Sequence, residues 1–228
     1  MTFSNTPDDL PTLSRDGDVF VLNLGSGENR FNPDWLDAVD AHLDTVEAAE
    51  GPRALVTTAA GKIWSNGLDL PWLMANADQI PAFGARVEAL FARVLVLGLP
   101  TVAALQGHAF GAGAMLALAH DQRVMRADRG FFCFPEVDIQ IPFSVGMSDL
   151  IAAKLPVRAA HDAMTTGRRY GGAESTAEGI VDEAVDEQSV LPAAMDRARA
   201  LAPKAGETLG TIKQRRYRAA LAELRNPA

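Results

Sequence analysis

The first part of the chain combines a short apolar run with an amphipathic stretch. Residues 19–24 (VFVLNL) have the composition of a strand, and the stretch after Asn32 and Pro33 repeats apolar residues at helical spacing. Asn32 suits the N-cap of a helix, and Pro33 suits its first helical position. The apolar face of this helix consists of Trp35, Leu36, Val39, Leu43 and Val46. The chain is therefore expected to begin with a strand and a capped helix that covers it.

The rest of the chain continues the alternation and then becomes helical. Further strands are expected over residues 53–58, 101–105, 122–126 and 130–134. Further helices are expected over residues 68–97 with a break near Pro81, and over residues 112–120, 146–166, 188–202 and 206–224. We find no low-complexity linker and no clear residue-level repeat. This order predicts an α/β fold with a helical C-terminal part.

Length and composition indicate one domain over residues 1–228. A chain of 228 residues with 48% hydrophobic residues can bury a substantial core. The polar start with Pro7 and Pro11 predicts a poorly ordered lead-in over about residues 1–14. The core is expected over about residues 15–190, and the C-terminal helices over about 188–228.

Charge and cysteine content narrow the classes of partner. The net charge of −8, without a block of one sign, argues against a nucleic acid or an anionic membrane as partner and favours a small molecule. No stretch approaches the roughly 20 apolar residues of a membrane helix, and the N-terminus lacks the pattern of a signal peptide. The single cysteine, Cys133, fits a reducing compartment, so we expect a cytoplasmic protein.

The segment GHAFGAGAML, residues 107–116, contains closely spaced glycines between a strand and an apolar helix. It does not fit a dinucleotide fingerprint, because Leu116 stands where a third glycine would permit close packing. A helix that is apolar on all sides is buried, and its first N–H groups then need a polar partner such as an anion or an oxyanion. A second glycine turn, WSNGLDL at residues 64–70, precedes another helix. One amide from each turn, facing the same carbonyl oxygen, would form an oxyanion hole.

Three segments in this order, WSNGLDL, TVAALQGHAFGAGAMLALAHD and FPEVDIQIP, resemble the crotonase (enoyl-CoA hydratase/isomerase) superfamily over about residues 15–190. Within it the chain is most similar to Δ3,Δ2-enoyl-CoA isomerases of the peroxisomal and plant type. The resemblance implies a spiral of repeated β-β-α units, a homotrimer or a dimer of trimers, and a role in fatty acid metabolism. It implies no cofactor, since coenzyme A is part of the substrate.

The resemblance also assigns the site residues. The backbone amides of Leu68 and Ala112 would hold the thioester oxygen of an acyl-CoA, and Glu136 would carry the proton. An apolar setting around Glu136 would raise the pKa of its carboxyl and exclude water. The substrate-binding residues implied in addition are Ser65, Asn66, Gly67, Asp69, Gly111, Met115 and Arg30.

Departures from the family pattern distinguish between reactions. Hydratases with two acids have a second glutamate where this chain has Met115, so the addition of water is disfavoured. Dienoyl-CoA isomerases place aspartates near Met115 and at the position of Ser144. The remaining match is an isomerase with one carboxylate, which moves a double bond from C3 to C2. The alternatives are an enoyl-CoA hydratase or other crotonase-type lyase, a non-catalytic acyl-CoA-binding protein and, third, a nicotinamide oxidoreductase.

Other polar residues receive structural interpretations. Asp138 is expected to be a hydrogen-bonded structural carboxylate, and His108 is expected to pack or to bond to the backbone. The histidines show no metal-ligand spacing, so we expect no metal site. Arg30 and Lys62 are the basic residues nearest the motifs, and either one could contact the phosphates of coenzyme A or remain a solvated surface charge.

Overall fold

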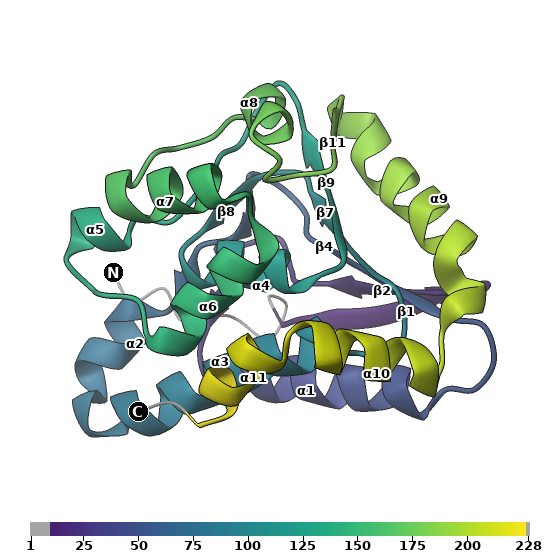
Figure 1. Ribbon diagram of the computed structural model, residues 1–228, viewed down its shortest axis with the longest axis horizontal. Coiled ribbons are helices and arrows are strands. Elements are labelled where there is room, and N and C mark those ends of the chain that lie inside the picture. The colour runs from purple at the N-terminus through teal and green to yellow at the C-terminus, as the bar shows by residue number, and fades with distance from the viewer. Residues whose placement is uncertain (1–9, 227–228) are drawn as a thin grey trace.

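The largest sheet of the protein has six strands in the order β1-β2-β4-β7-β9-β11 (Figure 1). The computed structural model describes residues 10–226 of the chain. β1 runs antiparallel to β2, and every other neighbouring pair is parallel. The strands are Thr12–Asp16 (β1), Val19–Asn23 (β2), Ala54–Thr58 (β4), Thr101–Leu105 (β7), Gln122–Arg126 (β9) and Glu183–Val185 (β11).

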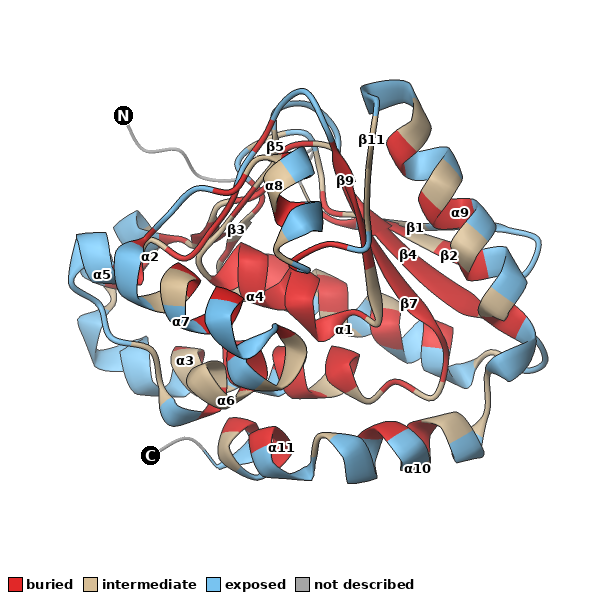
Figure 2. Ribbon diagram, turned by 45° about the horizontal axis from the view of Figure 1, so that its top comes forward, coloured by how far each residue is buried: buried red, intermediate tan, exposed pale blue. Residues whose placement is uncertain are grey.

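Both faces of this sheet are covered, and its central strands β4 and β7 are buried at every position (Figure 2). Side chains alternate between the faces. Val56 and Val102 belong to a cluster under α9 (Val190–Leu201), whereas Leu55 and Leu105 join the main core on the other face. Strands buried on two faces explain why the sequence shows apolar runs here instead of a polar alternation.

Two smaller sheets complete the strand content of the described residues. One has the order β10-β8-β5, and the other pairs β3 with β6. Their strands are Arg30–Phe31 (β3), Ile63–Ser65 (β5), Gly67–Leu68 (β6), His108–Phe110 (β8) and Phe132–Cys133 (β10). Along the chain, a strand of the large sheet is followed by a short strand of a small sheet and then by a helix. This order repeats from β2 to α5 and confirms the predicted spiral of β-β-α units.

The first helix, α1 (Pro33–Ala48), begins where the sequence predicts. The side chain of Asn32 accepts a hydrogen bond from the Trp35 amide at 3.0 Å, and Pro33 lies in the first turn. The five residues of the predicted apolar face are all buried. The ring of Phe31 stacks on Trp35 with centroids 4.3 Å apart, so the helix is fixed to the strand that precedes it.

The remaining helices follow the strands and then form the C-terminal part. They are α2 (Leu70–Ala75), α3 (Ile80–Leu95), α4 (Ala112–Ala119), α5 (Glu136–Ile139), α6 (Val145–Lys154), α7 (Val157–Thr166), α8 (Gly172–Ala177), α10 (Glu207–Arg216) and α11 (Arg218–Arg225). α11 packs against α3 and α6 (Figure 1). None of the helices within residues 10–226 is both long and apolar enough to cross a membrane.

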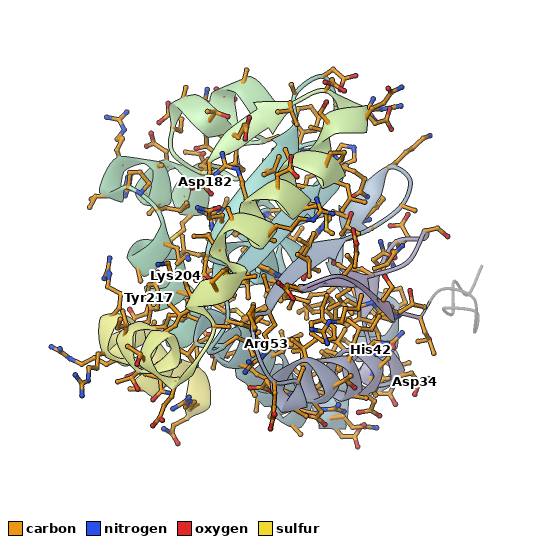
Figure 3. The ribbon with its side chains drawn as sticks, turned by 90° about the vertical axis from the view of Figure 1, so that its right-hand side faces the viewer. Asp34, His42, Arg53, Asp182, Lys204 and Tyr217 are labelled. Carbon is orange, nitrogen blue, oxygen red and sulfur yellow. The ribbon has the colours of Figure 1, made fainter. Side chains whose placement is uncertain are left out.

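The structure differs from the prediction at several short elements. β8, β11 and α8 were not predicted. The predicted break near Pro81 is present at residues 76–79, and Pro81 lies in the first turn of α3, which begins at Ile80. The expected lead-in is too long, because β1 already starts at Thr12. His42 of α1 also hydrogen-bonds to the Pro11 carbonyl oxygen at 2.9 Å (Figure 3). The rest of the expected lead-in, residues 1–9, lies outside the described residues.

Candidate active site

The three strands of the β10-β8-β5 sheet bring the three motif segments together. β8 pairs in parallel with β5 and with β10. The chain continues from β5 into the turn at residues 65–69, from β8 into α4, and from β10 into the segment that ends in Glu136. Because carboxyl ends of parallel strands meet at one edge of a sheet, these segments converge there.

The turn after β5 is held by Ser65 and requires Gly67. Ser65 Oγ accepts a hydrogen bond from the Gly67 amide at 3.1 Å and donates one to the Asn29 carbonyl oxygen at 2.8 Å. Gly67 has a φ of 73°, and a Cβ atom at this residue would lie 2.8 Å from the Ala112 amide nitrogen. A side chain is therefore excluded, and the two glycine turns lie directly against each other.

The amide of Leu68 points away from the neighbouring strand β3. The next amide, that of Asp69, donates to the Phe31 carbonyl oxygen at 3.0 Å within the β3-β6 pair. Successive amides of a strand point in opposite directions, so the Leu68 N–H faces the other side of β6. α4 contacts β6.

The N-terminus of α4 presents amides without a side-chain cap. Gly111 is the N-cap residue, with a φ of 53°, and its own amide donates to the Cys133 carbonyl oxygen at 3.0 Å. Among residues 10–226, the Ala112 amide has no hydrogen-bond acceptor. Every residue of α4 is buried, so this positive helix end can be satisfied only by a group that enters the site.

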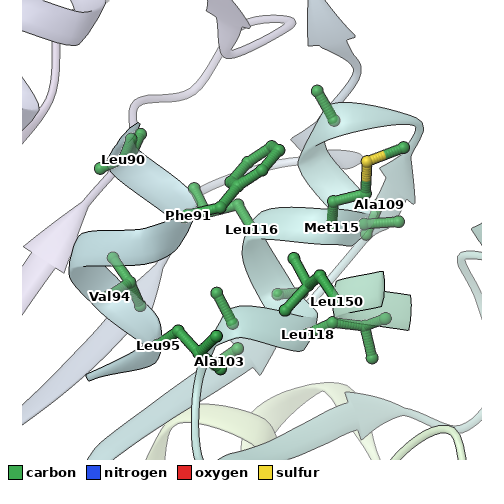
Figure 4. Packing of buried hydrophobic residues seen from close by; sticks show 14 of the residues in the cluster. Leu90, Phe91, Val94, Leu95, Ala103, Ala109, Met115, Leu116, Leu118 and Leu150 are labelled. Atoms are coloured by element: carbon green, nitrogen blue, oxygen red, sulfur yellow. The ribbon is translucent and has the colours of Figure 1, made fainter. Parts of the chain in front are cut away.

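The packing of α4 accounts for the small residues of its motif. A Cβ atom at Gly113 would lie 2.6 Å from the Ser65 carbonyl oxygen, so a glycine is needed for the close approach of α4 to β5. Figure 4 shows Met115, Leu116 and Leu118 of α4 among the buried apolar residues of α3 and α6. The helix is thus packed against its neighbours on all sides, which fixes the direction of the Ala112 amide.

Glu136 lies beside this helix end. It is the first residue of α5, after Pro135, and is only 8% exposed. A Cβ atom at Gly111 would lie 3.3 Å from Glu136 Oε1, and Oε2 is buried without a hydrogen-bond partner among the described residues. Burial raises the pKa of this carboxyl to about 7. Such a group exchanges a proton readily near neutral pH.

A pocket of about 410 Å³ extends from Glu136. Its other lining residues come from α5, the segment after it, α6 and α7. They are Val137, Gln140, Ile141, Pro142, Phe143, Ser148 and Met164. The Phe143 ring packs edge-on against Phe134 with centroids 6.1 Å apart, and Phe134 packs in the same way on Phe132 at 5.3 Å. Of these three rings Phe143 lines the pocket, and the fully buried Phe134 and Phe132 support it from the core.

The structure thus brings together Gly67, Leu68, Gly111, Ala112 and Glu136, but it places other predicted residues differently. Asp69 caps α2 through a hydrogen bond from the Trp72 amide at 3.2 Å. The side chain of Asn66 and the guanidinium of Arg30 both contact the carboxylate of Glu28. Asn66 and Asp69 also use their amides within the protein. Met115 is 1% exposed and does not line the pocket.

Two kinds of residue escaped the sequence analysis. Asn29 has a φ of 49°. Its side-chain amide donates to the carbonyl oxygens of Ile63 and Trp64, both at 3.0 Å, and so holds β5 next to the turn at residues 65–69. Only its position before Arg30, between a strand and a helix, could have suggested such a turn. Ser148 and Met164 reach the pocket through the packing of α6 and α7, for which the sequence carries no local signal.

Other polar residues have local partners instead of a place in the site. His108 packs between Phe110 and Phe131, with ring centroids 5.1 and 5.5 Å away. Burial raises the pKa of the Cys133 thiol to about 11, and this thiol donates to the Gly167 carbonyl oxygen at 3.3 Å. No cluster of three or more histidine, cysteine, aspartate or glutamate residues suited to a metal ion occurs in the part of the chain that the structure describes.

Comparisons with known proteins show the family of the chain. Residues 18–226 match the family model described as enoyl-CoA hydratase/isomerase. Enoyl-CoA delta isomerase 3 of Arabidopsis thaliana is 37% identical over 217 residues, and the peroxisomal enoyl-CoA delta isomerase 2 of the same plant is 36% identical over 219 residues. Each match covers 90% of this chain and 91% of the relative. The apo structure of an enoyl-CoA isomerase from Mycobacterium tuberculosis superposes with a TM-score of 0.88 at 26% identity, and the match covers 95% of both chains.

Proposed function

Because the chain belongs to the enoyl-CoA hydratase/isomerase family, we propose that it moves a double bond from C3 to C2 of an enoyl-CoA thioester. One observation carries this proposal. Glu136 is the one titratable group among the described residues that line the pocket, and the family's position for a second acid holds the buried, apolar Met115. A single carboxyl can carry a proton from one carbon to another, whereas the addition of water needs a second group to position the water.

The first step is the loss of a proton from C2. The thioester oxygen accepts hydrogen bonds from the amides of Leu68 and Ala112, and the end of the α4 dipole adds to their field. This polarisation makes the protons on C2 acidic. The ionised carboxylate of Glu136 takes one of them, and the electron pair of the broken C–H bond delocalises over C2–C4 and the thioester oxygen as a dienolate.

The second step returns the same proton at C4. The protonated Glu136 donates it, the electron pair of the dienolate forms the new C4–H bond, and the double bond settles between C2 and C3. A carboxyl with a pKa of about 7 suits both halves of this cycle, because it is neither too weak a base at C2 nor too weak an acid at C4. The apolar ring of Phe143, which lines the pocket and packs on Phe134, keeps water away from the dienolate.

Replacement of the carboxyl tests the assignment. Glu136→Gln keeps the shape of the side chain but removes the base, so turnover of 3-hexenoyl-CoA to 2-hexenoyl-CoA should fall by at least 10³-fold, while the circular dichroism spectrum stays unchanged. The matched control is Glu50→Gln, at an exposed residue after α1, which should retain the turnover of the wild type. A Glu136→Gln protein that keeps more than a tenth of the wild-type rate would remove Glu136 from the mechanism.

The assembly is part of the same proposal. We propose a homotrimer or a dimer of trimers, in agreement with the family resemblance. Large apolar side chains outside the pocket, such as Val157 and Ile212, are exposed and available for contacts between copies. Light scattering should give a mass of three or six times 24.3 kDa, and a monomer would contradict the proposal.

A further inference from the structure

A second cavity, which we call the α10 cavity, lies away from the candidate active site. Its lining comes from the chain around the starts of β7 and β9, from the stretch between the end of α9 and Lys204, and from α10 with Tyr217. Figures 1 and 2 both place α10 away from α5, and Figure 3 labels Lys204 and Tyr217. The volume of about 340 Å³ lies within the range of roughly 300–1,000 Å³ that small-molecule sites occupy. The α10 cavity shares no lining residue with the pocket of the candidate active site.

One face of α10 lines this cavity, and its character changes along the helix. Leu209, Ile212, Lys213 and Arg216 all line the cavity, and their spacing of three and four residues places them on the same side of a helix. The two apolar side chains come before the two cations, and Leu201 of α9 adds a further apolar side chain to the lining. The α10 cavity therefore has an apolar part and a cationic part.

Lys213 brings a buried ammonium group to the cationic part. It is only 5% exposed, and its Nζ donates to the Asp121 carboxylate at 2.6 Å and to the Leu99 carbonyl oxygen at 2.8 Å. The same oxygen of Asp121 accepts from the Thr101 amide at 2.9 Å, so the ion pair joins α10 to the sheet. An ammonium group has three N–H donors. Among residues 10–226, the third N–H of Lys213 has no acceptor, which leaves one buried donor for a group that enters the cavity.

The other charges of the lining are positive. Asp121 is the one carboxylate among the described lining residues, and Lys213 neutralises it. Within residues 10–226, Lys204 and Arg216 form no ion pair. The Arg216 guanidinium lies over the ring of Tyr217, 5.3 Å from the ring centroid, which holds it beside the cavity. In a chain with a net charge of −8, this local excess of positive charge favours an anion as the occupant.

We propose that the α10 cavity binds a small amphiphilic anion, an alkyl carboxylate of about eight carbons. The carboxylate accepts a hydrogen bond from the third N–H of Lys213 and pairs with Arg216. The alkyl chain covers Leu201, Leu209 and Ile212, of which Ile212 is otherwise 58% exposed. At about 30 Å³ for each water-sized group, the volume holds roughly ten non-hydrogen atoms, which fits octanoate and is too small for a nucleotide or coenzyme A.

Calorimetric titration of the whole protein with sodium octanoate measures this binding. Hexanoate has two methylenes fewer to remove from water, so it should bind about ten-fold more weakly. The alcohol 1-octanol keeps the alkyl chain but lacks the charge, so it should bind at least about five-fold more weakly than octanoate.

Variants of α10 locate the head and the chain of the ligand. Arg216→Gln should weaken octanoate binding about five-fold, the upper end for an exposed ion pair. Ile212→Asp places a negative charge beside the alkyl chain and should weaken binding at least about ten-fold. Arg215→Gln is the matched control. Arg215 is the exposed neighbour of Arg216 and its loss removes the same charge, but it does not line the cavity, so the affinity should not change.

Hydrogen exchange measured by mass spectrometry separates the α10 cavity from the pocket at Glu136, which is also partly apolar. Octanoate should slow exchange in peptides from residues 199–217 and leave residues 134–148 unchanged. Light scattering of the wild type and of Ile212→Asp separates a ligand from a second copy of the chain as the cover of Ile212. The two proteins should have the same mass.

Five outcomes would overturn the inference. Octanoate fails to bind, or 1-octanol binds as tightly as octanoate. Arg215→Gln weakens binding as much as Arg216→Gln, which would indicate a general effect of surface charge. Octanoate protects only residues 134–148, or Ile212→Asp changes the mass in solution. None of these measurements depends on turnover, so they test the α10 cavity whether or not the protein is an isomerase.

Discussion

Glu136→Gln should make the protein more stable at alkaline pH, although it removes the proposed base. Burial raises the pKa of this carboxyl from its ordinary 4.5 to about 7, which means that the folded state holds a proton that the unfolded state has already released. The carboxyl therefore contributes most to stability below pH 4.5, and this contribution disappears as the pH rises through about 7. At pH 8 the wild type must keep an ionised, buried carboxylate with one unpartnered oxygen.

The magnitude follows from the pKa. One tenfold change in the protonation equilibrium corresponds to about 1.36 kcal/mol, so a change from 4.5 to about 7 corresponds to about 3 kcal/mol at most. The amide of glutamine cannot ionise and avoids this cost. We expect Glu136→Gln to exceed the wild type by about 2–3 kcal/mol in the free energy of unfolding at pH 8 and to differ little from it at pH 4.5.

Urea denaturation followed by circular dichroism measures this difference. Both proteins are unfolded at the two pH values and at one fixed protein concentration, since assembly makes the apparent stability depend on concentration. Glu50→Gln, at an exposed residue, serves as the control and should not change the pH dependence. A Glu136→Gln protein that is less stable than the wild type at pH 8, or a difference that is the same at both pH values, would contradict a raised pKa of Glu136.

Three further predictions concern the pH dependence of the reaction, the turn and a second buried acid. Because the base must be ionised, kcat/KM should fall about tenfold for each pH unit below about 7, and a profile that stays flat down to pH 5 would contradict this. Ser65→Ala removes the hydroxyl that accepts from the Gly67 amide, so steady-state assays should show kcat reduced about ten-fold or more, and urea denaturation a stability lower by about 1–2 kcal/mol. Ser14→Ala on the exposed edge strand should change neither. Burial also raises the pKa of Glu88, which is 4% exposed, so Glu88→Gln should raise stability at pH 8 but not at pH 4.5, with turnover within two-fold of the wild type.

The features that local sequence determines were predicted correctly. Asn32 and Pro33 mark the start of α1 because an N-cap bond and a fixed φ act within one turn. The need for a polar partner at α4 also followed from the sequence, because a helix that is apolar on every side must be buried and leaves its first amides free. The aromatic surroundings of Glu136 were expected from its neighbours in the chain.

The features that depend on distant pairing could not be predicted in this way. β8, with three residues, is too short to show a period of two and exists because β5 and β10 flank it. Asn29 supports the site only because the fold brings its carbonyl oxygen within hydrogen-bond distance of Ser65 Oγ. Met164 reaches the pocket only because α7 packs on α5. Asp69 lies in the matching motif, but its carboxylate caps α2 and its amide pairs with β3.

In the proposed reaction, one carboxyl moves a double bond and adds no water. The most direct test gives the protein 3-hexenoyl-CoA and, separately, 2-hexenoyl-CoA, and separates the products by chromatography coupled to mass spectrometry. We predict that the first substrate is converted to 2-hexenoyl-CoA. In both reactions, 3-hydroxyhexanoyl-CoA should stay below one hundredth of the total hexenoyl-CoA. Formation of 3-hydroxyhexanoyl-CoA at a rate comparable to isomerisation would instead identify the protein as a hydratase.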